Sequence, residues 1–223
     1  MSRIIQVSEL TYAARDRRRI LENVFLSVER GKAVGIVGKT GSGKSLLVAL
    51  LQGELRPQSG QILVNDRNVT RLSPAKLGQL RQHLGVLPQT PVWPEQLSVA
   101  EALQFKLSWL GLSAKQTARK IEETLTLLDM ASLQNKRFPD LNLLERKIAY
   151  LASSLCHDPV LLLGDDPFSG LSEEGETTLA LLLKKVRERR HLTTLLTGRR
   201  SAPLQRLGCR IVSLDNGNLE ETV

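Results

Sequence analysis

Gly38-Lys39-Thr40-Gly41-Ser42-Gly43-Lys44-Ser45 is the stretch of the chain that decides its fold. It fits the pattern G-x-x-x-x-G-K-[ST] and lies between an apolar run at Ala33–Val37 and a second apolar run that begins at Leu46. A strand, a glycine-rich turn and a helix form the context in which this pattern binds phosphate. Backbone N–H groups and the positive end of the helix are predicted to surround the phosphates, with Lys44 on the β and γ oxygens and Ser45 on Mg²⁺. The alternative is a glycine-rich turn before an ordinary helix, which the spacing and the flanking residues disfavour.

Length and composition fit a globular protein. The chain has 223 residues, of which 41% are hydrophobic, and this is ample for a core. No stretch approaches the roughly 20 consecutive apolar residues that span a bilayer, and the first residues lack the form of a secretory signal. A cytoplasmic location is therefore expected. Cys156 and Cys209 have no C-x-x-C spacing and are expected to be reduced thiols, and the three histidines are too scattered to indicate a metal site.

Basic residues outnumber acidic ones by 31 to 23, which gives a formal charge of +8. They gather at residues 15–19, 184–190 and 199–206. Such a balance favours polyanions, including nucleotides, nucleic acid and anionic lipid headgroups. Aromatic residues make up only 4% of the chain and do not alternate with the basic runs. Because bases need such stacking platforms, nucleic acid is disfavoured as a partner.

The apolar patterns predict an α/β fold. Strands are expected at residues 3–12, 24–28, 33–37, 62–64, 84–87, 160–163 and 193–197, with a terminal hairpin at 211–219 that turns at Asp215-Asn216-Gly217. Up to residue 90 the pattern predicts sheet with one helix. Further helices are expected at residues 98–111, 114–129, 144–157 and 172–190. The first two of these begin at predicted capping boxes, from Ser98 to Glu101 and from Ser113 to Gln116.

Polar residues follow two of the predicted strands. Asp165 and Asp166 come after the apolar run at 160–163, and Gln89 follows the strand at 84–87. Joined to the glycine-rich stretch and to Ser169-Gly170-Leu171, they resemble the nucleotide-binding subunits of ABC transporters over essentially the whole chain. In detail, residues 68–72 and 80–89 and the Phe138-Pro139 pair resemble the branch of the FtsE cell-division and LolD lipoprotein-release proteins.

The resemblance implies a P-loop NTPase fold in which a RecA-like core carries an antiparallel β arm and an inserted α-helical subdomain. Within a single ABC ATPase domain at 1–223, the core and arm are expected at 1–90 and 156–223, and the helical subdomain at 91–155. ATP and Mg²⁺ are the implied cofactors.

The resemblance also implies roles for single residues. Tyr12 matches the aromatic residue that stacks on adenine, although a core tyrosine at a strand end is the alternative. Ser45, Gln89 and Asp165 match the groups around Mg²⁺, and Gln89 and Asp166 match the catalytic positions. The other expected nucleotide contacts are Gly38, Lys39, Thr40, Gly41, Ser42, Gly43, Lys44, Ser45 and Leu46.

Four functional positions depart from the family pattern. Leu141-Asn142-Leu143-Leu144-Glu145 stands where the family has Leu-Ser-Gly-Gly-Gln, the segment that reaches the γ-phosphate on the opposite subunit. Leu143 and Leu144 are expected to obstruct an anion there, whereas Asn142 can still donate one hydrogen bond.

The other three departures are single residues. Asp166 replaces the Glu that positions the attacking water and is one methylene shorter. Gly198 stands at the place of the switch His, so no imidazole remains there. Ser172 replaces the Asp that communicates across the dimer. Because phosphoryl transfer depends on positioning and charge stabilisation, hydrolysis is expected to be slow or impaired.

The expected function is that of an ATP-binding subunit of an ABC-type membrane complex, peripheral on the inner face of the cell membrane. It would couple closure of a homodimer, or of a heterodimer with a second ABC ATPase subunit, to an integral membrane permease. The alternative is a non-hydrolysing, FtsE-like regulatory or scaffold protein that docks on an FtsX-like membrane protein. A third possibility is a soluble ABC protein that acts on nucleic acid, and only the positive charge supports it. The transported substrate is not readable from the sequence.

Overall fold

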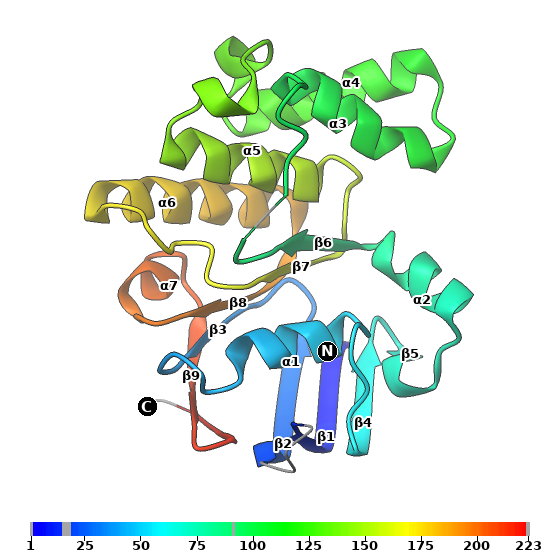
Figure 1. Cartoon of the computed structure of the whole chain (residues 1–223), viewed down its shortest axis with the longest axis vertical. Helices are drawn as coiled ribbons and strands as arrows, with labels where there is room; N and C mark the ends of the chain where they lie inside the picture. Colours follow the sequence, from blue (N-terminus) through cyan, green and yellow to red (C-terminus); the bar gives the residue numbers. More distant parts are fainter. Residues whose placement is uncertain (1, 15–18, 91, 222–223) are drawn as a thin grey trace.

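A computed structural model describes residues 2–14, 19–90 and 92–221. Its strands form two sheets, one with the order β10-β9-β3-β8-β7-β6 and one with the order β2-β1-β4-β5 (Figure 1). Of the basic cluster expected at 15–19, only Arg19 lies within the described residues.

The six-stranded sheet is parallel except for its last strand. β3 pairs in parallel with β8 and β9, and β7 pairs in parallel with β6 and β8. β9 and β10 form the expected hairpin, in which Asn216 and Gly217 turn with positive φ values of 46° and 82°, as a two-residue turn of this kind requires. The strands are β3 Ala33–Val37, β6 Leu84–Leu87, β7 Leu161–Gly164, β8 Thr193–Gly198, β9 Arg210–Asp215 and β10 Asn218–Glu221.

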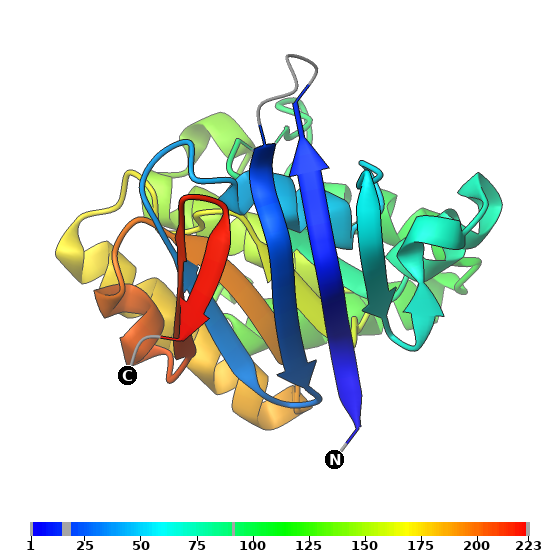
Figure 2. The same cartoon turned by 90° about the horizontal axis from the view of Figure 1, so that it is seen from below.

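The second sheet is antiparallel and is seen in front when the molecule is viewed from below (Figure 2). Its strands are β1 Arg3–Ala13, β2 Arg19–Glu29, β4 Ser59–Val64 and β5 Arg67–Asn68. Ile5 of β1 stands opposite Val28 on one side and Val64 on the other, and all three side chains are buried. They share one apolar cluster with helix α1, Lys44–Leu51, and with residues of β3, β7 and β8. The helix that follows the glycine-rich stretch is therefore packed between the two sheets.

A layer of helices covers the other face of the six-stranded sheet (Figure 1). The expected capping boxes are confirmed, because Ser98 and Glu101 bond reciprocally at the start of α3, as do Ser113 and Gln116 at the start of α4. Among the described residues, no helix is both long enough and apolar enough to cross a membrane. α5 Leu143–Leu155 and α6 Glu173–Arg190 lie next to the sheet, and α3 Val99–Leu107 and α4 Ala114–Leu127 lie beyond α5 (Figure 1). The short helices are η1 Val69–Arg71, η2 Ser108–Leu110, η3 Ala131–Leu133, η4 Phe138–Asp140 and α7 Ala202–Arg206.

The prediction of a single helix before residue 90 is wrong, because α2 spans Pro74–Arg81. Only Leu77 and Leu80 of this helix are buried, so it has no apolar stripe that periodicity detects. The start signal was nevertheless in the sequence. Ser73 caps the helix through a bond from the Lys76 amide, and Pro74 occupies the first turn, which is the position that proline favours.

Both cysteines are free thiols, as expected. Burial raises the pKa of Cys156 to about 11 and that of Cys209 to about 12. Both therefore stay protonated at neutral pH and behave as small apolar side chains.

Candidate nucleotide-binding site

The predicted phosphate-binding stretch and the acidic pair meet at one edge of the six-stranded sheet. β3, β8, β7 and β6 are adjacent and parallel, so the residues that follow them lie at the same carboxyl edge, where such sheets bind ligands. The Gly38 amide donates to the Gly198 carbonyl at 3.3 Å, and the Asp165 amide donates to the Leu87 carbonyl at 2.8 Å. Neighbouring strands thus bring segments 38–45, 165–166 and 198–199 together.

Residues 38–43, which we call the cradle, lead directly into α1. Gly43 precedes the helix with a φ of 103°, no side chain caps the helix, and its first turn holds no acidic residue. Its first N–H groups therefore keep the partial positive charge that attracts anions. Gly38 is required sterically, since a Cβ there would lie 2.5 Å from the Leu214 oxygen.

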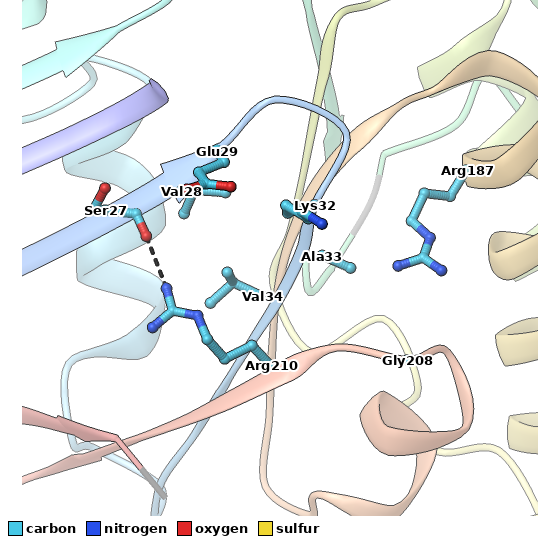
Figure 3. Close-up of a pocket in the computed structure, with 9 residues that line it drawn as sticks. All are labelled: Ser27, Val28, Glu29, Lys32, Ala33, Val34, Arg187, Gly208 and Arg210. Carbon is cyan, nitrogen blue, oxygen red and sulfur yellow. Dashed lines mark hydrogen bonds between the residues drawn. The ribbon is translucent and has the colours of Figure 1, made fainter. Parts of the chain in front are cut away.

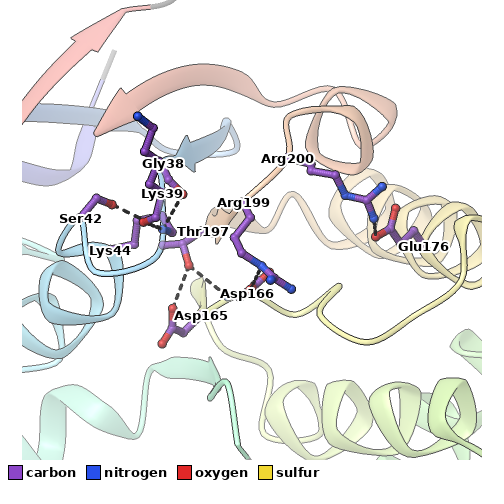
Figure 4. A network of polar contacts seen from close by, with 10 residues as sticks. All are labelled: Gly38, Lys39, Ser42, Lys44, Asp165, Asp166, Glu176, Thr197, Arg199 and Arg200. Carbon is purple, nitrogen blue, oxygen red and sulfur yellow. Dashed lines mark hydrogen bonds and ion pairs between the residues drawn. The ribbon is translucent and has the colours of Figure 1, made fainter. Parts of the chain in front are cut away.

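Lys44 lies folded across the cradle (Figure 4). Its Nζ donates to the carbonyl oxygens of Gly38 at 2.7 Å and Lys39 at 2.8 Å, and the residue is 7% exposed. Burial lowers the pKa of Lys44, while attraction to Asp166 and Asp165 works in the opposite direction. A buried ammonium held by backbone oxygens is well placed to exchange those contacts for phosphate oxygens.

Thr197 at the end of β8 organises the acidic pair. Its hydroxyl donates to Asp165 Oδ1 at 2.9 Å and accepts from the Asp166 amide at 3.0 Å. Asp165 and Asp166 are only 9% and 7% exposed, and Asp166 has a φ of 46° in the left-handed region. No motif in the sequence predicts a role for Thr197. The only signal was a third threonine in the strand Thr193–Gly198, one residue before Gly198.

Arg199 was also missed, and it reaches the same place. Its Nε lies 3.4 Å from Asp166 Oδ2, although its side chain remains 60% exposed. Arg200, the next residue, turns the other way and pairs with Glu176 (Figure 4). Gly198 leaves no imidazole at this edge, but a guanidinium lies beside Asp166.

Tyr12 and Gln89 lie farther from the acidic pair. Tyr12 is half-buried on β1 opposite Leu21, and a Cβ on Gly43 would lie 3.1 Å from Leu21 Cδ2. The predicted adenine residue is thus one strand away from the cradle. Gln89 is exposed beyond the end of β6, at the same carboxyl edge.

The remaining predicted contacts lie in the cradle and the first turn of α1. Leu46 packs against the apolar cluster around α1, so only its backbone is available to a nucleotide. Ser45 at the second position of the helix is exposed. Thr40, Gly41 and Ser42 form the tip of the cradle, where the Ser42 amide donates to the Lys39 carbonyl at 3.2 Å.

Residues 141–145 form the start of α5, which begins with a capping box. Asn142 Oδ1 accepts from the Glu145 amide at 2.9 Å, and Glu145 Oε2 accepts from the Asn142 amide at 2.8 Å. Leu143 is 46% exposed. Ser172 likewise caps α6, accepting from the Gly175 amide at 3.2 Å, a role that Asp fills equally well.

A hollow of about 560 Å³ lies at the opposite edge of the sheet, next to the first residues of β3 and β9 (Figure 3). Lys32, Arg187 and Arg210 line it, but Arg210 is engaged by the Ser27 carbonyl and by Glu221. Because it adjoins the beginnings of the strands, this hollow is separate from the cradle.

The sequence profile described as ABC transporter matches residues 21–169, and the chain belongs to this family. Members of the family bind Mg-ATP, so the expected cofactors and the expected class of ATP-binding cassette are confirmed. The chain is similar to the methionine import ATP-binding protein MetN 2 of Lactiplantibacillus plantarum, with 30% identity over 203 residues, 90% of this chain and 59% of that protein. It therefore spans less than two thirds of the length of this curated relative.

Two solved structures share the fold. CbiO1 of Clostridium perfringens, described as part of the ABC transporter complex cbiONQ, superposes with a TM-score of 0.90 at 24% identity, over 99% of this chain and 88% of that one. The ATP-binding cassette MJ0796, a dimer bound to ADP and Pi, gives a TM-score of 0.85 at 20% identity, over 97% and 98% of the two chains. The predicted P-loop NTPase fold is thereby confirmed.

Proposed function

We propose that this chain is the ATP-binding subunit of a membrane transport complex and that Mg-ATP drives closure of two such subunits. One observation carries the proposal: the buried side chain of Lys44, at the start of the uncapped helix α1, lies across the cradle at the edge that holds Asp165 and Asp166. Positive charge, free N–H groups and carboxylates for Mg²⁺ are what phosphate binding needs. The methionine import relative supports transport as the wider role.

In this proposal each predicted residue has a definite task. The amides of the cradle and the first turn of α1, with Lys44, bind the phosphates. Ser45, Gln89 and Asp165 hold Mg²⁺, and Tyr12 stacks on the adenine. Asp166 and Gln89 orient the attacking water.

We further propose that hydrolysis is slow. Asp166 is shorter than glutamate and is paired with Arg199, Gly198 provides no imidazole, and residues 141–145 form a capped helix start. The loss of one stabilising contact in a transition state of this kind lowers the rate on the order of 10- to 1000-fold. Finer placement in the branch of the FtsE cell-division and LolD lipoprotein-release proteins belongs to the same proposal.

The partner in this proposal is an integral membrane protein, a permease or an FtsX-like protein, on the inner face of the membrane. Its contact surface lies in the expected helical subdomain, residues 91–155, between core segments 1–90 and 156–223. Phe105 and Trp109 support this placement, since they pack edge to face at 6.5 Å yet stay 57% and 76% exposed. Exposed aromatic pairs of this kind favour protein interfaces. The second cassette is either another copy of this chain or a sister subunit.

Calorimetry with Mg-ATP tests the nucleotide site directly. We expect saturable binding by this chain alone, with a dissociation constant in the micromolar range that is usual for such sites. No detectable heat, either for the chain alone or for the chain with its membrane partner, would contradict the proposal.

Steady-state phosphate release by the reconstituted membrane complex tests the second part. Slow turnover that follows ATP binding supports an impaired transporter subunit. Unchanged assembly without any turnover supports the FtsE-like scaffold. Rapid turnover by a complex that contains only this cassette would contradict slow hydrolysis.

A further inference from the structure

We infer that Arg199 is the residue through which this subunit distinguishes ATP from ADP. With a γ-phosphate in the cradle, its guanidinium leaves Asp166 for the phosphate oxygens, whereas with ADP it stays on Asp166. The inference rests on the proposed function, because it presumes that Mg-nucleotide occupies the cradle.

The backbone places Arg199 at the rim of the cradle. Val37 pairs with Gly198 across β3 and β8, and the Gly38 amide donates to the Gly198 carbonyl at 3.3 Å. The first glycine of the cradle is therefore fixed one residue from Arg199. This anchor keeps the start of the arginine side chain in place while its end remains free to move.

Arg199 also lies between two hollows at this edge. One, of about 160 Å³, is lined by Asp166 and Gly170, and the other, of about 530 Å³, is lined by Gly38 and Lys39. Arg199 lines both of them, as does Arg200. A rotation of a few torsion angles therefore moves the guanidinium from the side of the carboxylate to the side of the cradle.

The present contact of Arg199 with Asp166 is weak enough to be exchanged. It is a single approach at 3.4 Å from a side chain that is 60% exposed, and water screens such pairs strongly. A terminal phosphate carries more charge and accepts two parallel N–H bonds from a guanidinium. Arg200 is not an alternative, since it contacts Glu176, whose side chain is only 4% exposed, on the far side (Figure 4).

The charges converge on one point. Repulsion from Arg199 contributes to the lowered pKa of Lys44, so the two cations are close enough to repel each other. Asp166 and Asp165 attract the Lys44 ammonium. A γ-phosphate placed between Lys44 and Arg199 relieves their repulsion, and it also repels Asp166, which frees that carboxylate to contact water. ADP lacks this group and leaves the pair intact.

Binding of Mg-ADP and of a non-hydrolysable Mg-ATP analogue, both measured by calorimetry, tests the inference. In Arg199→Ala we expect affinity for the triphosphate to fall about 10- to 100-fold, because one charge-assisted bidentate contact is lost. Affinity for ADP should change by less than about 3-fold, which is within the effect of one screened surface charge. Arg199→Lys should keep part of the preference, since the charge remains without the fork.

Arg189→Ala is the matched control, because it removes one exposed arginine at the far end of α6. It should leave both affinities unchanged. Thermal unfolding of each variant establishes that it is folded. If Arg199→Ala binds both nucleotides as the wild type does, or weakens both equally, the inference is overturned and the proposed function stands. If the wild type binds neither nucleotide, the proposed function fails with it.

Discussion

Two helices of this molecule begin at the places where an ABC cassette is expected to meet phosphate, and they begin differently. α1 starts after Gly43 with no side-chain cap and no acidic residue in its first turn. α5 starts at Asn142, whose side-chain oxygen accepts from the Glu145 amide, while the Glu145 carboxylate accepts from the Asn142 amide. This start therefore has one amide of its first turn occupied and carries a negative charge. The first start is open to an anion, whereas at the second start side chains already occupy the amides of Asn142 and Glu145.

The difference teaches that a helix start binds phosphate only while its N–H groups remain available. The sequence predicted obstruction of residues 141–145 by the side chains of Leu143 and Leu144. The structure adds an electrostatic reason, because Glu145 places negative charge where the helix dipole would favour an anion. Asn142 uses its side-chain oxygen to accept from the Glu145 amide, and donation from its Nδ2 group to phosphate stays a prediction.

The largest effect is expected at the open start. Lys44→Ala removes the cation that faces the phosphates, and nucleotide affinity in calorimetry should fall by more than about 100-fold. Lys32→Ala is the control, since Lys32 is an exposed lysine just before β3 at the opposite edge of the sheet. Equal losses in the two variants would show that general charge, and not the cradle, attracts the nucleotide.

The next effect is expected when the capped start is opened. A variant that combines Asn142→Ser, Leu143→Gly, Leu144→Gly and Glu145→Gln keeps residue types that can form a capping box but removes the bulk and the charge. Light scattering with Mg-ATP should show dimerisation at about 10- to 100-fold lower protein concentration, because phosphate can then contact the partner's α5.

Glu145→Gln alone separates charge from bulk in that comparison. It should give a smaller gain, on the order of a few-fold, since it removes one carboxylate near a helix dipole. Dimerisation that is unchanged in both variants would mean that the start of α5 does not limit closure.

A pH effect should belong to the cradle lysine. Burial lowers the pKa of Lys44 below its ordinary 10.5. As pH rises, the free protein therefore loses this charge at a lower pH than an exposed lysine does, and nucleotide affinity should begin to decline before pH 10.5 is reached. The stability has the opposite sign. The folded state holds fewer protons than the unfolded state between the lowered pKa and 10.5, so the free energy of unfolding rises with pH in that window. Urea unfolding of Lys44→Met should lack this rise, and an identical rise in that variant would assign it to another group.

The smallest effect concerns the stability of the capped start. Asn142→Ala should lower the free energy of unfolding by about 1 kcal/mol, whereas Asn142→Ser should stay within about 0.5 kcal/mol of the wild type. Urea denaturation measures both. Equal stability of all three proteins would show that the cap at α5 contributes nothing to the free energy of unfolding.

Sequence patterns predicted most elements where local chemistry decides them. The two serine capping boxes, the strand at Leu84–Leu87 and the Asn216-Gly217 hairpin all have short-range signals, and all are present. Helix α2 was missed because Leu77 and Leu80 are its only leucines, and two buried side chains are too few to show a period. The Ser73-Pro74 start signal did not outweigh the absence of a helical period in its apolar residues.

The candidate site divides in the same way. Residues 38–45 are a contiguous motif, and Lys44 and the glycines lie as the motif requires. Thr197 and Arg199 act only through neighbours about 30 residues away in sequence, across the β7 and β8 pairing. No spacing rule connects a strand threonine with Asp165, so only the folded chain reveals that contact.

The hydroxyl of Thr197 has a mechanical consequence. The same oxygen bonds the side chain of Asp165 and the main chain of Asp166, so a tilt of β8 displaces both carboxylates together. Since β8 also borders the glycine turn through β3, movement of the nucleotide and movement of the acidic residues become one motion of one strand.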